Sequence, residues 1–189
     1  MADFPEQSVI LRPMREEDLD EIMVIEASAP GNPWSRESME KELVNPQAHY
    51  LTAVLCTDGR EDGPGDQTGG SGETSTETGE VAGAGADPVD MGEVAGYAGY
   101  WQVMDEGHIM NIAVREDLRS RGIGRALMEA MLKEGDSLGI LYWTLEVRVS
   151  NAPALHLYEK TGFTSAGIRP GYYSNPKEDA NILWLSRSV

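Results

Sequence analysis

The sequence predicts an α/β fold in which a mixed central sheet carries helices on both of its faces. Two observations support this fold, and a third gives the number of domains. Short apolar runs of strand length alternate with runs in which apolar residues recur every three or four positions. Residues 140–150 are almost continuously apolar, which is typical of a strand buried on both faces. The chain has 189 residues with 40% hydrophobic content, so we expect a single domain spanning residues 1–189.

Strands are expected where apolar and β-branched residues concentrate between turn-forming residues. The segments that fit are residues 8–13, 49–56, 94–104, 108–114, 140–150, 166–174 and 180–186.

Helices are expected at residues 16–28, at 35–45, from 123 to Gly135 or Gly139, and at 152–162. Ser35 is a typical N-cap residue, and Gly162 is a typical helix stop. In the first helix, Glu26 falls on the same stripe as the apolar residues Leu19 and Ile22.

An acidic, glycine-rich segment, residues 57–92, divides two expected strands. Between Asp58 and Glu93 the chain carries ten acidic residues and only Arg60, about half of the net charge of −17. This composition cannot bury enough apolar surface to offset its ordering entropy, so we expect a disordered insertion. Lengthening a hairpin loop about tenfold adds only ~2 kcal/mol of closure entropy, so the domain can tolerate it.

Composition also excludes several classes of protein. The acidic balance argues against direct nucleic-acid binding and leaves a basic protein partner open. No apolar run is long enough to span a membrane, and the N-terminus lacks the pattern of a signal peptide, so we expect a cytoplasmic protein. Cys56 is the single cysteine, which excludes an internal disulfide and makes a metal site implausible.

Residues 119–124, RSRGIG, lie between an expected strand and an expected helix. Glycines let a backbone approach a ligand closely, and the free N–H groups of a helix N-terminus bind anions. A dinucleotide fingerprint would need a glycine at Leu127, and a P-loop would need Gly-Lys-Ser/Thr, so neither fits. The residues alone leave two interpretations: a phosphate site, or a turn that lets helix pack on strand.

The neighbouring sequence narrows this choice. Arg119, Gly122 and Gly124, followed about twenty residues later by TLEVRVSNAPALHLYEKTGF, resemble the GNAT acetyltransferase superfamily. The set NPWS, NIAV, RSRGIGRALM, LEVRVSNAPALHLYEKTGF and IRPGYY resembles more closely the RimI family of ribosomal-protein alanine N-acetyltransferases. The resemblance covers nearly the whole chain outside residues 57–92, and it implies a GNAT fold that uses acetyl-CoA as co-substrate.

The resemblance also assigns cofactor contacts. The pyrophosphate of acetyl-CoA would lie against Arg119, Ser120, Arg121, Gly122, Ile123, Gly124 and Arg125. The pantetheine arm would bind the backbone of Ile112, Ala113 and Val114, and Asn151 would contact the same cofactor. From its position alone, Asn151 could equally cap the helix that follows.

Two side chains are candidates for the chemistry, because acetyl transfer to an amine needs a proton acceptor and a donor for the leaving thiolate. Glu146 is the only carboxylate in YWTLEVRV; buried and unpaired it would have a raised pKa and could act as a base, directly or through water. It could instead form an ion pair with Arg148 or another arginine. The Tyr158 phenol can donate a proton without being charged, or be ordinary packing. The resemblance implies that Glu146 accepts the proton and Tyr158 donates one.

Acceptor recognition rests on the resemblance, which implies that Trp34, Tyr172 and Tyr173 lie near the bound peptide, although aromatic residues also serve as packing. No serine or cysteine is spaced with a histidine as a nucleophile, so we expect direct transfer in a ternary complex.

The expected acceptor is the N-terminal α-amine of an alanine-starting protein, the basic eighteenth small-subunit ribosomal protein. At pH 7 about a tenth of an α-amine is neutral. Deprotonating a lysine amine costs ~3.4 kcal/mol more, because its pKa is higher. The alternatives are acetylation of a lysine or small-molecule amine and, from another class, an acidic CoA-binding interaction module.

Overall fold

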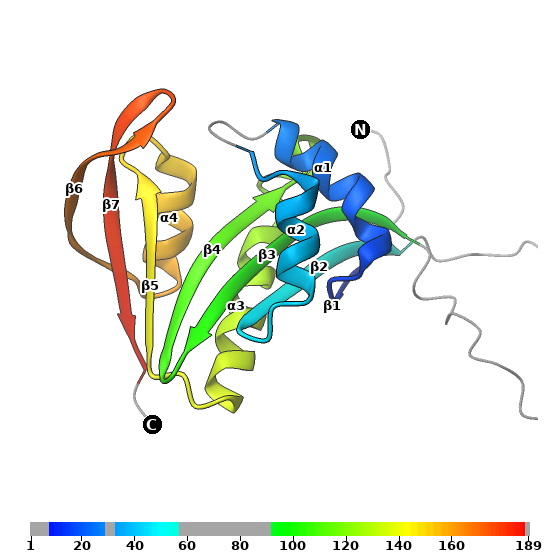
Figure 1. Ribbon diagram of the computed structural model, residues 1–189, viewed down its shortest axis with the longest axis horizontal. Coiled ribbons are helices and arrows are strands. Elements are labelled where there is room, and N and C mark those ends of the chain that lie inside the picture. Colours follow the sequence, from blue (N-terminus) through cyan, green and yellow to red (C-terminus); the bar gives the residue numbers. More distant parts are fainter. Residues whose placement is uncertain (1–7, 29–32, 57–91, 188–189) are drawn as a thin grey trace, which may run out of the picture.

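The computed structural model describes residues 8–28, 33–56 and 92–187. In these residues the mixed sheet predicted from the sequence is confirmed, with strand order β1-β2-β3-β4-β5-β7-β6 (Figure 1). Its strands are β1 (Ser8–Pro13), β2 (Ala48–Cys56), β3 (Glu93–Val103), β4 (Glu106–Val114), β5 (Tyr142–Arg148), β6 (Thr164–Ser174) and β7 (Lys177–Ser186). Neighbouring strands are antiparallel except β4 and β5, which are parallel.

Helices cover both faces of the sheet, as the sequence predicts. They are α1 (Leu19–Ser28), α2 (Arg36–Leu43), α3 (Ile123–Ser137) and α4 (Ala152–Lys160). The helices α1 and α2 pack on one face with Tyr50 and Tyr97, while α3 and α4 pack on the other with Tyr100 and Trp143 (Figure 1). The domain therefore has two apolar cores, one on each side of the sheet.

The boundaries of α3 show which of its two glycines ends the helix. The helix continues through Gly135 and ends at Ser137, and Gly139 follows in the left-handed conformation with φ 80°. A Cβ at Gly135 would lie 2.2 Å from Cζ2 of Trp143. Gly135 is therefore small because the indole packs against it, and Gly139 is the helix stop.

One expectation about β5 is wrong. The strand is buried on one face only: Trp143, Leu145 and Val147 point into the core, but Tyr142 is exposed and Glu146 is partly exposed. The apolar run misleads because the opposite face of β5 carries a single apolar residue, Tyr142, beside Thr144, Glu146 and Arg148. Glu146 is consequently not a buried carboxylate.

The predicted insertion, residues 57–92, joins β2 to β3, which pair with each other as neighbours through Leu55 and Glu93. Residues 57–91 lie outside the described part of the chain, so the prediction of disorder stays a prediction there. The strand pairing continues up to the edge of the insertion, and the insertion therefore occupies the place of a hairpin loop.

Candidate functional site

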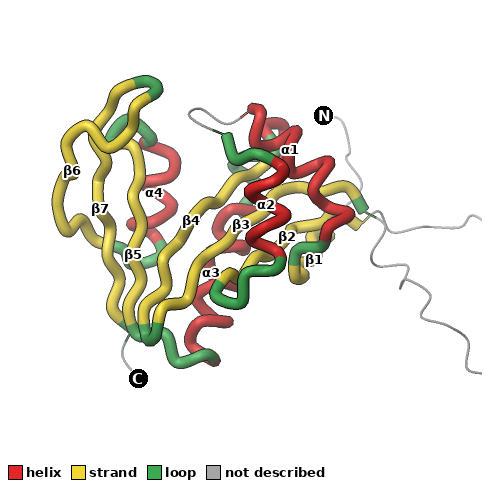
Figure 2. Tube along the Cα trace, in the orientation of Figure 1, coloured by secondary structure: helices red, strands yellow, loops and turns green. Residues whose placement is uncertain are grey.

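The parallel pair of β4 and β5 opens a free strand edge in the middle of the sheet. The two strands pair only at Glu106–His108 with Tyr142–Thr144. Beyond these positions they diverge (Figure 2). Along the remainder of β4, no described strand pairs with the edge that faces β5.

Backbone alternation decides which residues of β4 present their polar groups to this free edge. The N–H of Arg115 donates to the Ala95 carbonyl at 2.9 Å, and alternate residues of an antiparallel strand bond to the same neighbour. Ala113 therefore turns its backbone groups toward β3. Ile112 and Val114 turn theirs to the free edge, which favours these two among the predicted pantetheine contacts.

At the end of β4 the chain turns into the N-terminus of α3. Ser120 and Gly122 both adopt positive φ, 63° and 87°. Gly122 is the N-cap and has no side chain to accept a hydrogen bond, so no side chain caps the helix. The first N–H groups of α3 are thus available to an anion, as the phosphate interpretation requires.

Gly124 differs from Gly122 because it lies inside α3. A Cβ at this position would lie 3.6 Å from both Leu157 Cδ2 and Val114 Cγ2, which is ordinary contact. The start of α3 therefore packs against β4 and α4 with room for a methyl group, so this contact does not require a glycine at position 124.

The two glycines are expected to respond differently to alanine. Gly122→Ala should lower the free energy of unfolding by about 1 kcal/mol, because a side chain is strained at left-handed φ. Gly124→Ala is the matched control and should leave stability unchanged or raise it by up to about 1 kcal/mol, since its conformation is helical. Urea unfolding of the two variants beside the unchanged protein tests this. Equal effects at both positions would contradict it.

The predicted arginines around this turn have different surroundings. Arg119 donates from Nε to the Val114 carbonyl at 3.2 Å, so it braces the turn against β4. Arg125 donates to Glu129 at 2.7 Å one helical turn away, and both side chains are largely exposed. Such an exposed pair contributes little to stability and can exchange for a phosphate partner.

Asn151 caps α4, which was one of the two roles expected for it. Its Oδ1 accepts from the Ala154 N–H at 3.2 Å. The side-chain amide group remains a donor, so capping and a cofactor contact are compatible.

Glu146 lies on the uncovered face of β5 and has an arginine partner. Arg169 Nη1 is 3.4 Å from Glu146 Oε1, and the two side chains are 57% and 31% exposed. The carboxylate is therefore paired, as the ion-pair alternative allowed, and its partner is Arg169 and not Arg148. Arg148 is occupied elsewhere, because it contacts Glu178 and the carbonyl of Asn175.

Two tyrosines, Tyr158 and Tyr173, are the proton-donor candidates near β5. Tyr173 donates from its hydroxyl to the Glu146 carbonyl at 3.1 Å. Burial raises the pKa of Tyr158, and the nearby Tyr173 phenol raises it further. Burial likewise raises the pKa of Tyr173 to about 12. Both phenols therefore keep their protons at neutral pH and can act as donors.

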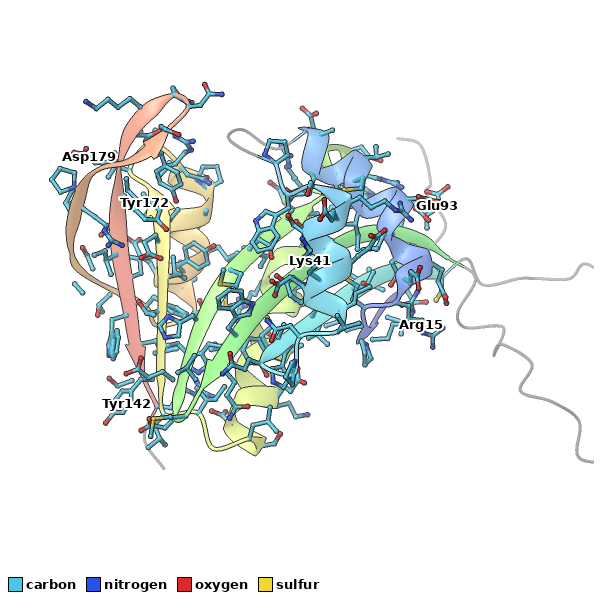
Figure 3. The ribbon with its side chains drawn as sticks, viewed as in Figure 1. Arg15, Lys41, Glu93, Tyr142, Tyr172 and Asp179 are labelled. Atoms are coloured by element: carbon cyan, nitrogen blue, oxygen red, sulfur yellow. The ribbon has the colours of Figure 1, made fainter. Side chains whose placement is uncertain are left out.

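Arg148 on β5 binds the turn of the β6–β7 hairpin, whose β7 strand pairs with β5. The Arg148 guanidinium lies 4.1 Å from the centre of the Tyr173 ring and donates to the Asn175 and Pro176 carbonyls. Tyr172 meets the Tyr173 ring edge-on and is 45% exposed. In Figure 3 Tyr172 lies beside β5, across the molecule from Lys41 on α2. Contacts thus link Tyr172, Tyr173 and Glu146, and the Tyr173 phenol raises the pKa of Tyr158.

Trp34 comes from a different element, just before the Ser35 N-cap of α2. Its ring packs against the core formed by α1 and α2. The backbone N–H of Trp34 donates to the buried carboxylate of Glu26 at 2.7 Å. Sequence reasoning missed Glu26 and also Arg169. For Glu26 a signal was present, because a carboxylate on an apolar helix stripe needs polar partners.

A family model described as the acetyltransferase (GNAT) family matches residues 74–163. A Bacillus subtilis protein, provisionally named a ribosomal protein bS18 alanine N-acetyltransferase, is 36% identical over 180 residues, 93% of this chain and 94% of that protein. The ribosomal protein bS18 alanine N-acetyltransferase of Escherichia coli K12 is 43% identical over 100 residues, 52% of this chain and 68% of that protein.

Solved structures give the same picture. The crystal structure of the Escherichia coli ribosomal protein alanine N-acetyltransferase superposes with a TM-score of 0.70 at 28% identity and covers 96% of both chains. Ard1 from Thermoplasma volcanium, at 20% identity and a TM-score of 0.72, shares the fold. None of the described helices is long and apolar enough to cross a membrane.

Proposed function

Because the chain belongs to the GNAT acetyltransferases and, among them, to the RimI family of ribosomal-protein alanine N-acetyltransferases, we propose that it acetylates the N-terminal alanine of ribosomal protein bS18. The observation that carries this proposal is the 36% identity over nearly the full length of both chains. We further propose a cytoplasmic location, where ribosomal proteins are made.

Acetyl-CoA, when bound, supplies the acetyl group as a thioester. The proposal assigns its pyrophosphate to the uncapped N-terminus of α3 and its pantetheine arm to the free edge of β4. The donors present fit these groups: backbone N–H groups and arginines for the anion, and the backbone of Ile112 and Val114 for the amide groups of the arm.

Within this proposal the α-amine of the acceptor lies at Glu146. The carboxylate accepts the proton that the amine loses, and it exchanges its contact with Arg169 for one with the acceptor. Tyr158 donates its phenolic proton to the departing sulfur. Direct transfer then needs no covalent intermediate on the chain, and Tyr172 and Tyr173 border the acceptor from the hairpin.

The function is tested with acetyl-CoA and a short peptide that matches the bS18 N-terminus. A gain of one acetyl group on this peptide, together with release of free CoA, is expected. The same peptide with a blocked α-amine is the matched control and should gain none, even where it contains lysine. Acetylation of both peptides would point to lysine as acceptor. Acetylation of neither, with acetyl-CoA binding intact, would overturn the proposal.

A further inference from the structure

A buried carboxylate ties the start of α2 to β3 and β4. Glu26 on α1 is only 6% exposed. One of its oxygens accepts from the Trp34 N–H at 2.7 Å, and the other accepts the hydroxyl of Tyr97. Asn111 on β4 donates from Nδ2 to the Tyr97 hydroxyl oxygen at 2.8 Å. These residues form one chain of hydrogen bonds that ends at an asparagine.

The positions of the protons in this series of hydrogen bonds decide the orientation of the Asn111 amide. Burial raises the pKa of Tyr97, and the charge of Glu26 raises it further, so the phenol keeps its single proton. It gives that proton to Glu26, and its oxygen can then only accept. Nδ2 of Asn111 must therefore face Tyr97, and Oδ1 must face away from it.

The amide oxygen of Asn111 lacks a hydrogen-bond donor. Asn111 Oδ1 is buried, and among the described residues nothing donates to it. A buried acceptor without a partner costs about 1–3 kcal/mol, which a bound donor would recover. Tyr97 and Glu26 keep this oxygen from being satisfied by a simple rotation of the amide.

Asn111 and Glu146 share a face of the sheet and lie just beyond the point where β4 and β5 separate. The last paired residues are His108 and Thr144. Asn111 contacts Tyr97 on the face covered by α1, and Glu146 points away from the opposite core, which holds Leu145. The two side chains thus lie on the same face of the sheet, on the two strands that separate there.

We propose that Asn111 Oδ1 accepts a hydrogen bond from the α-amine of the acceptor, which makes Asn111 an acceptor-binding residue. This inference rests on the proposed function. An attacking amine has a lone pair and two N–H bonds, and an acceptor at one N–H fixes its rotation about the Cα–N bond. The lone pair is then directed at the acetyl carbon. Tyr97 and Glu26 are positioning residues that act through Asn111.

Asn111→Ala should lower kcat/KM for the alanine-starting peptide about tenfold, the value of one good hydrogen bond, and leave the KM for acetyl-CoA within about twofold. Asn181→Ala is the matched control, because Asn181 Oδ1 already accepts from Ser165 at 2.6 Å. It should leave both constants unchanged. Thermal unfolding of each variant checks that the fold is intact.

Two further measurements separate binding from a merely structural role. Tyr97→Phe removes the hydrogen bond that fixes the Asn111 amide and should lower kcat/KM for the peptide about threefold to fivefold. The double variant with Asn111→Ala should have the same kcat/KM as Asn111→Ala alone. A peptide that starts with N-methylalanine has one N–H fewer. The preference for alanine over N-methylalanine should therefore fall about tenfold in Asn111→Ala, a ratio from which the bulk of the methyl group cancels.

An unchanged kcat/KM in Asn111→Ala would overturn this inference and leave the proposed function standing. Losses of kcat/KM that add in the double variant would do the same. An equal rise in the KM for acetyl-CoA would also overturn it. Absence of peptide acetylation by the unchanged protein would overturn the proposed function, and the inference with it.

Discussion

Glu146→Gln is expected to lower kcat for the bS18 peptide by about 10²- to 10⁴-fold, the usual range for loss of a general base. Glutamine keeps the shape of the side chain but cannot accept a proton from an amine. Because the carboxylate is partly exposed at the edge of β5, its removal should leave the fold unchanged. Steady-state kinetics with varied peptide and saturating acetyl-CoA measures the effect.

Arg169→Gln is the control that separates the two roles expected for Glu146. It removes the ion pair but leaves the carboxylate in place. An exposed pair contributes about 0–1 kcal/mol, so this variant should change kcat only a few-fold. If Glu146 were merely the partner of Arg169, the two variants would lose activity equally, and the role of base would be wrong.

The pH dependence of Glu146→Gln gives a second readout. Without a base, only acceptor that is already neutral reacts, and the neutral fraction of an α-amine with a pKa near 7.8 rises about sevenfold from pH 7 to pH 9. The variant's rate at subsaturating peptide should rise by that factor. A rate of Glu146→Gln that does not change with pH would mean that Glu146 is not the group that accepts the proton of the amine.

Tyr158→Phe is expected to lower kcat about 100-fold, the lower end of the range for loss of a general acid. The phenol is 6% exposed, and burial raises its pKa above the ordinary value. It therefore stays protonated to a higher pH than an exposed tyrosine would. The unchanged protein should lose no activity through titration of Tyr158 below about pH 10.

The free energy of unfolding of Tyr158→Phe checks that the loss of activity is not a loss of structure. Phenylalanine retains the ring contact with Phe163, whose centroid lies 5.9 Å from that of Tyr158. The unfolding free energy should stay within about 0.5 kcal/mol, as for a change that leaves packing intact. A Tyr158→Phe variant with at least half of the original kcat would show that the leaving sulfur takes its proton from elsewhere.

Local patterns in the sequence predict most of the fold. The order of strands and helices, the N-cap at Ser35 and the stop at Gly162 follow from periodicity and from turn chemistry, which act over a few residues. The β5 strand is the exception, since burial on both faces requires neighbours on both faces. Those neighbours depend on the separation of β4 from β5, which the run of apolar residues does not encode.

The candidate site divides in the same way. Glu146, Tyr158 and the glycine turn are candidates that the sequence offers through residue type and motif, and their roles stay predictions. Their partners could not be read. Arg169 reaches Glu146 from β6, and Tyr173, whose phenol raises the pKa of Tyr158, also lies in β6.

The sequence by itself thus determined the family, the order of elements and the groups able to hold a phosphate, accept a proton and donate one. Only the tertiary structure decided that Glu146 is paired and partly exposed, and that Glu26, Tyr97 and Asn111 form one hydrogen-bonded chain. The physical reason is range. Backbone propensity and capping act between near neighbours in the chain, whereas burial and hydrogen-bond partners depend on residues that meet only when the sheet is assembled.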